Sequence, residues 1–186
     1  MRWIALFLAL VLAPALAAQP VAYTLDRERS LVGFSFDIGN DEVKGNMPVA
    51  AATIALDLDR LSRSTAQVTL NTRDAVTELG FATEAMLGAS VLDADTFPTI
   101  SFQATSVSGT LAGGKIEGQV TIRGVTRPVT LDAQVFRQRD TEEGDRSRLS
   151  VLMTGTVDRR DFGADGFAQF VGPEIRLEIL TRLTRS

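Results

Sequence analysis

The sequence predicts one all-β domain of about eight antiparallel strands, with a single helix within the series of strands. Three observations support this class. Nearly every segment after residue 22 alternates apolar and polar residues, which is the period of a half-buried strand. Clusters of Gly, Asn and Asp separate these segments by gaps of hairpin length. One stretch, residues 78–92, instead places its apolar residues at helical spacing.

The expected strands cover residues 32–38, 54–58, 66–71, 100–105, 115–123, 129–135, 149–154 and 175–179. The alternation is most regular in residues 115–123, and we expect its apolar face to point inward. That face consists of Ile116, Gly118, Val120 and Ile122, whereas Lys115, Glu117 and Gln119 form the polar face. The turn signals are Gly39-Asn40-Asp41, Gly113-Gly114 and residues 141–145.

The helix is expected over roughly residues 79–91, because Leu79, Ala82, Met86 and Val91 are spaced for one helical face. Gly80 and Gly88 weaken this prediction, since glycine is a poor helix former.

The strand pattern fits two architectures, a sandwich or a closed barrel. A sandwich fills its interior with side chains from two facing sheets, whereas an eight-stranded barrel can hold one small ligand. The short gaps between strands favour consecutive antiparallel pairing, and therefore slightly favour the barrel. The function depends on this choice, because only the barrel leaves room inside for a ligand.

Residues 1–17 have the features of a secretory signal peptide. Arg2 is followed by eleven apolar residues, and Ala15-Leu16-Ala17 is a small-residue cleavage pattern. The apolar stretch is too short for a membrane-spanning helix. We therefore expect cleavage near Ala17, an exported chain without a stable membrane span, and one domain over residues 18–186.

Composition excludes several classes of function. The formal net charge is −4, so phosphate backbones would repel the chain and nucleic acid is not an expected partner. There is no Cys, so no disulfide can form. There is no His, which removes the Ser-His-Asp triad and nearly every transition-metal site. We predict no catalytic residues, no metal and no cofactor.

Paired carboxylates are the one feature that keeps an enzymatic alternative open. Asp93 with Asp95 and Asp158 with Asp161 could supply the two acids of a hydrolase such as a glycosidase. The neighbouring Arg and Thr residues favour turn capping and surface ion pairs instead. Asp161 is expected to satisfy backbone donors at a turn, and Gly163 to adopt a conformation closed to other residues.

Three motifs resemble those of the YceI-like family of exported polyisoprenoid-binding proteins. They are residues 97–102 (FPTISF), 118–129 (GQVTIRGVTRPV) and 159–163 (RRDFG), which occur in the order and spacing of the family. Residues 23–36 (YTLDRERSLVGFSF) are also similar to the opening hairpin of the family. The resemblance covers roughly residues 22–183.

The resemblance implies an extended, lipocalin-like barrel of eight antiparallel strands, capped by the helix. Its apolar channel would hold an isoprenoid chain, such as a polyprenyl lipid or a quinone tail. The channel residues expected from this resemblance are Phe34, Phe36, Met86, Phe97, Ile100, Phe102 and Phe162. The expected function is a non-enzymatic periplasmic carrier, as a monomer or homodimer. The alternative is an envelope stress-response or structural module with a filled core.

The chain departs from the family in two places. Asp37 stands where most members carry a His, and residues 47–52 (MPVAAA) replace a stretch that usually contains aromatics. The small residues are expected to change the width of the channel at their level. Ala104 and Gly118 are expected to face inward, at positions where a Phe would fill the channel.

Overall fold

A computed structural model describes residues 19–139 and 141–186, so the expected signal peptide lies outside the described residues. This part of the chain forms a β-barrel with one α-helix, α1 (Gly80–Leu87), and two short 3₁₀ turns, η1 (Leu61–Arg63) and η2 (Arg159–Phe162). The strands are β1 (Val21–Leu25), β2 (Leu31–Ile38), β3 (Asp41–Asn46), β4 (Val49–Leu56), β5 (Thr65–Asn71), β6 (Val76–Thr77), β7 (Thr99–Gly109), β8 (Gly114–Ile122), β9 (Val125–Arg137), β10 (Arg148–Asp158) and β11 (Glu174–Arg185).

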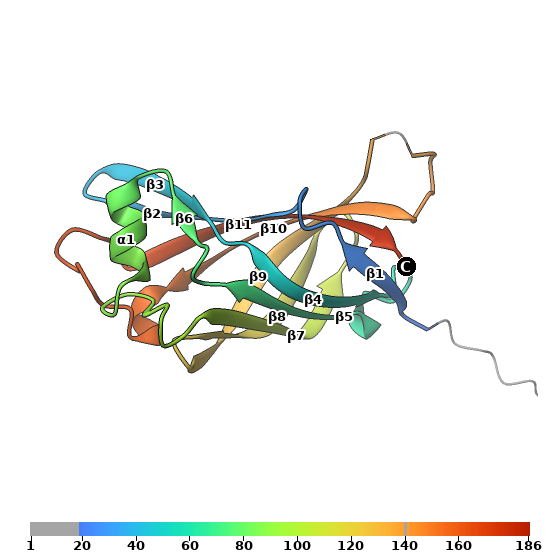
Figure 1. Ribbon diagram of the computed structural model, residues 1–186. Coiled ribbons are helices and arrows are strands. Elements are labelled where there is room, and N and C mark those ends of the chain that lie inside the picture. Colours follow the sequence, from blue (N-terminus) through green and yellow to red (C-terminus); the bar gives the residue numbers. More distant parts are fainter. Residues whose placement is uncertain (1–18, 140) are drawn as a thin grey trace, which may run out of the picture.

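The strands close into an eight-stranded antiparallel barrel, as predicted (Figure 1). The eleven strand segments form eight barrel strands, because three of these strands are each interrupted and consist of two segments. The interrupted strands are β1 with β2, β3 with β4, and β5 with β6, and each pair of segments continues along one line of the wall. β11 closes the barrel by pairing with both β1 and β2. Sandwich packing is thereby excluded.

The expected hairpin over residues 23–36 is wrong. β1 pairs with β4 and β11, and β2 pairs with β3 and β11, so the two segments lie end to end along the same neighbour. The bend at residues 26–30 is fixed locally, because Ser30 Oγ donates to the Asp26 carbonyl at 2.6 Å. It interrupts one strand without reversing its direction, which the local turn residues alone cannot reveal.

Helix α1 exists but is shorter than residues 79–91. It ends at Leu87, and Gly88 is extended (φ −65°, ψ 165°). The following chain folds back on the helix end, where the amides of Leu92 and Ala94 donate to the carbonyls of Met86 and Leu87. Ala82 and Met86 are buried as the spacing predicts, whereas Val91 reaches the interior from a turn.

The predicted alternation in β8 is confirmed. Lys115, Glu117 and Gln119 are exposed, and Ile116, Gly118 and Val120 are buried or half-buried. The inward face of this strand therefore belongs to the barrel interior.

Two ends of the barrel differ in how they are filled. Near the chain termini, a cluster around Tyr23, Leu149 and Leu183 packs the interior, and the Tyr23 hydroxyl donates to the Arg146 carbonyl at 2.8 Å. The opposite end carries α1 and η2 (Figure 1). In the described part of the chain, no helix has the length and hydropathy needed to cross a membrane.

Candidate functional site

The barrel encloses a cavity of about 510 Å³ that extends along its length. Its lining includes Ala82 and Met86 of α1 and Leu61 of η1. These two elements lie toward opposite ends of the barrel (Figure 1). Every strand except β3 and β6 contributes side chains, nearly all of them aliphatic or aromatic. Among the described residues that line the cavity, none has a carboxylate, and the ionisable side chains are Lys115 and Arg159. This volume is within the usual range for sites that bind small molecules.

The structure brings together six of the seven predicted channel residues. Those that line the cavity are Phe34, Phe36, Met86, Ile100, Phe102 and Phe162. Phe34 and Phe36 stack with ring centroids 6.4 Å apart. Phe97 is half-buried beside Gly124, 3.2 Å from where a Cβ on that glycine would lie, and is not part of the lining. The F-P motif turns the chain before β7, which directs Phe97 away from the interior that Ile100 and Phe102 face.

At the α1 end, the cavity reaches the surface between three phenylalanines. Phe81 of α1 is 65% exposed, and Phe167 and Phe170 of the loop between η2 and β11 are 45% and 62% exposed, yet all three line the cavity. The apolar wall therefore continues from the interior to the outside of the molecule. Sequence reasoning missed these residues, because Phe81 lies outside the predicted apolar face of the helix and the loop that carries Phe167 and Phe170 has no periodic pattern.

The loop of residues 163–173 forms one side of this opening and is held by Arg159. Arg159 is buried, and its guanidinium donates to four backbone carbonyls of the loop. The acceptors are Gly172 (2.9 Å from Nε), Gly166 (2.8 Å from Nη1), Val171 (3.0 Å from Nη2) and Ala164. Burial lowers the pKa of this guanidinium from its ordinary value. The loop is also tied to its surroundings by the amides of Gly166 and Gly172, which donate to Ser90 and Asp37 carbonyls.

The RRDFG motif is therefore a structural clamp on the loop of residues 163–173, but the roles of its residues differ in part from the prediction. Gly163 adopts the left-handed conformation (φ 69°), as expected. The expected turn-capping role of Asp161 is wrong, because Asp158 caps η2 by accepting from the Arg160 amide at 2.9 Å, while Asp161 is exposed. Asp158 also pairs with the Arg160 side chain at 2.6 Å, and this contact holds the pKa of Asp158 at about 2.

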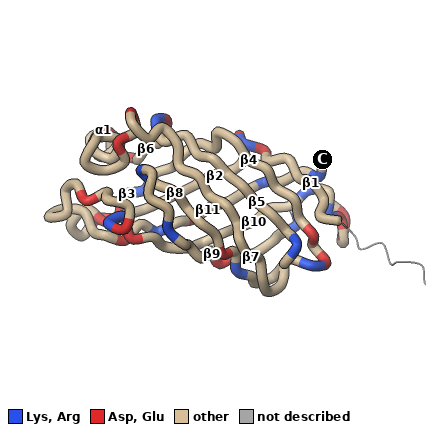
Figure 2. The backbone as a smooth tube through the Cα atoms, turned by 90° about the horizontal axis from the view of Figure 1, so that it is seen from below, with Lys and Arg blue, Asp and Glu red and all other residues tan. Residues whose placement is uncertain are grey.

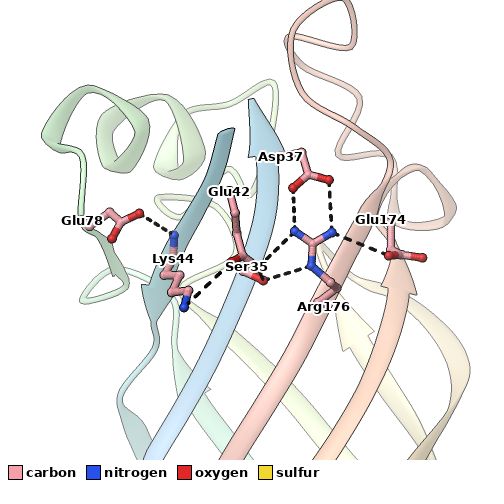
Figure 3. Close-up of polar contacts among 7 residues, drawn as sticks. All are labelled: Ser35, Asp37, Glu42, Lys44, Glu78, Glu174 and Arg176. Atoms are coloured by element: carbon pink, nitrogen blue, oxygen red, sulfur yellow. Dashed lines mark hydrogen bonds and ion pairs between the residues drawn. The ribbon is translucent and has the colours of Figure 1, made fainter. Parts of the chain in front are cut away.

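Outside the barrel, close to the same end, Asp37 belongs to a polar cluster that spans β2, β3 and β11 (Figure 3). Arg176 Nη2 lies 2.6 Å from Asp37 Oδ1 and 3.3 Å from Glu42 Oε1. The hydrogen bond from Arg176 lowers the pKa of Asp37, and that from Ser35 lowers the pKa of Glu42. Arg176 of β11 therefore ties β2 and β3 to its own strand on the outer face, and Asp37 is its partner on β2.

The paired carboxylates do not meet at the cavity. Of the described residues Asp93, Asp95, Asp158 and Asp161, none lines it. Seen from below, charged residues lie mainly on the loops and toward the ends of the barrel (Figure 2). Within the described ranges, no group of three or more acidic side chains is arranged to hold a metal ion.

Comparison with known proteins agrees with this geometry. The profile of the YceI-like domain matches residues 23–183, which is most of the chain. The chain belongs to the YceI-like family. Protein YceI of Salmonella arizonae is 28% identical over 149 residues, which cover 78% of each chain.

Two solved structures have the same fold. BcnA of Burkholderia cenocepacia aligns with a TM-score of 0.75 at 16% identity, over 86% of this YceI-like chain and 99% of BcnA. A polyisoprenoid binding domain from Saccharophagus degradans aligns with a TM-score of 0.62 at 12% identity, over 89% and 99% of the two chains. At such identities the likeness concerns the fold.

Proposed function

We propose that this YceI-like protein is a non-enzymatic carrier that binds one isoprenoid-chain lipid, a polyprenyl lipid or a quinone tail, in the barrel cavity. The observation that carries the proposal is the cavity itself, about 510 Å³ in volume and lined almost entirely by apolar side chains. A filled-core structural module has no need for such a space, since protein interiors are normally close-packed.

The energetics suit a long apolar chain. Each methylene removed from water contributes about 0.8 kcal/mol, so about ten buried methylenes correspond to the free energy of micromolar binding. The costs of association reduce this value, and a longer chain offsets them. A wall with few polar groups thus suffices for binding, without specific contacts to a head group.

The opening at α1 supplies a route for the lipid. Phe81, Phe167 and Phe170 extend the apolar wall to the surface, so a chain can enter without crossing a polar barrier. The polyisoprenoid binding domain of similar fold supports this ligand class. The signal-peptide pattern of residues 1–17 supports a periplasmic location after cleavage near Ala17.

The experiment that tests the proposal is native mass spectrometry of protein purified from the envelope of its own host, followed by organic extraction. We expect a stoichiometric prenyl lipid or quinone in the extract and a cleaved N-terminus. Protein that is fully folded but yields no lipid, and that binds no added isoprenoid, would leave the structural module as the better interpretation. Hydrolytic turnover of the bound lipid would instead support the enzymatic alternative.

A further inference from the structure

Two glycines of the barrel wall lie beneath phenylalanine rings that line the cavity. Gly45 of β3 is directly opposite Phe34 of β2, and a Cβ on Gly45 would lie 2.4 Å from Cζ of that ring. Gly118 of β8 lies diagonally opposite Phe102 of β7, and a Cβ there would lie 2.3 Å from Cε2 of the ring. Each ring therefore occupies the space in which a side chain on the glycine would stand.

This arrangement keeps both rings against the wall. Carbon atoms in ordinary contact are about 3.5–4.0 Å apart, so a methyl group on either glycine would displace the ring by more than about 1 Å. The opposite side of the methyl group is blocked as well, by the Val76 carbonyl oxygen at Gly45 and the Gln103 carbonyl oxygen at Gly118, each 2.7 Å away. These oxygens belong to the backbone of the sheet, whereas the rings can rotate toward the cavity.

We infer that Gly45 and Gly118 set the width of the cavity at the levels of Phe34 and Phe102, and thereby select for methyl-branched over straight apolar chains. An isoprenoid chain carries a methyl branch on every repeat and needs a wider passage than a straight alkyl chain. With the rings over the two glycines the passage admits the branches, and with either ring displaced into the cavity it admits only the narrower chain. This inference rests on the proposed function, because it names the feature of the same cavity that selects its ligand.

The test compares the affinities of the purified protein for geranylgeraniol and for a saturated straight-chain alcohol of the same carbon number. We expect the wild type to prefer geranylgeraniol. In Gly118→Ala and Gly45→Ala the ratio of the two affinities should shift toward the straight chain by about tenfold, the usual effect of one methyl group in a tight apolar site. Gly113→Ala is the matched control, because a Cβ there meets nothing within 4 Å, and its ratio should equal that of the wild type.

A double variant covers the case in which the added methyl group disturbs the sheet. Phe102→Leu removes the displaced ring, so the double variant Gly118→Ala with Phe102→Leu should recover the preference for geranylgeraniol that Gly118→Ala loses. A folded Gly118→Ala protein with an unchanged ratio, or a double variant that stays as selective for straight chains as Gly118→Ala, overturns the inference and leaves the proposed function intact. A wild type that binds neither alcohol overturns both.

Discussion

Arg159 should contribute far more to stability than its neighbour Arg160, although the two are adjacent in the sequence and carry the same charge. Arg159→Met keeps an unbranched apolar stem but removes four hydrogen bonds to backbone carbonyls. At about 0.5–1.5 kcal/mol net for each bond, and with some carbonyls regaining water on an exposed loop, we expect a loss of about 2–4 kcal/mol. Arg160→Met breaks an exposed ion pair with Asp158 and should change stability little.

Urea denaturation measures the loss in the free energy of unfolding for each variant, provided that the m-value equals that of the wild type. Hydrogen exchange then locates the effect, since the amides of Gly166 and Gly172 should exchange faster in Arg159→Met and not in Arg160→Met. Arg159→Lys retains the charge but cannot place donors on four carbonyls at once, so it should resemble Arg159→Met. Equal losses for Arg159→Met and Arg160→Met, or full stability in Arg159→Lys, would refute the clamp.

Three further outcomes are expected. Leu177→Trp, on the inner face of β11, should reduce isoprenoid binding and should lower the stability by less than the usual overpacking cost of about 1–3 kcal/mol. Leu180→Trp, on the outer face, should bind normally, and equal binding by both variants in a titration would contradict a ligand in the cavity. Phe170→Ser should slow lipid uptake from vesicles in a stopped-flow assay while the affinity changes less, and unchanged uptake would place the entry elsewhere. Because the folded-state pKa of Asp158 is depressed to about 2, the contribution of this carboxylate to stability is present above pH 4 and lost between about pH 4 and pH 2. The urea midpoint of Asp158→Asn should therefore fall less over this range than that of the wild type. The same pH dependence of the midpoint in both proteins would argue against the pairing with Arg160.

The sequence predicted the barrel wall well because alternation reports directly on which face of a strand is buried. The inward placement of Ile116 and Val120 follows from the pattern of β8 alone. Phe34, Phe36 and Phe102 were predicted as channel residues by the family resemblance. They line the cavity because, like Ile116 and Val120, they stand at alternate positions on the inward face of a strand.

Other features depend on contacts that no local pattern encodes. The end-to-end arrangement of β1 and β2 is set by β11, at the far end of the chain. Arg159 and Arg160 look alike in the sequence, and only the path of the loop at residues 163–173 determines that Arg159 is buried among carbonyls. The helix was predicted too long because Val91 keeps the apolar spacing after Gly88 has ended the helix.

The pairing of β11 with β1 and β2 has a consequence for how the chain folds. The side-chain hydroxyl oxygens of Thr24 and Ser186 lie 2.8 Å apart, although 162 positions separate the two residues in the sequence. Because β1 pairs with β11, the barrel cannot close before this last strand is available. Joining such distant segments carries a large loop-closure entropy, and folds dominated by such pairings form slowly. A chain whose last strand has not yet been synthesised would therefore remain an open sheet. We expect refolding from denaturant to be slow, with pairing at the two termini among the last protections to appear in pulsed hydrogen exchange.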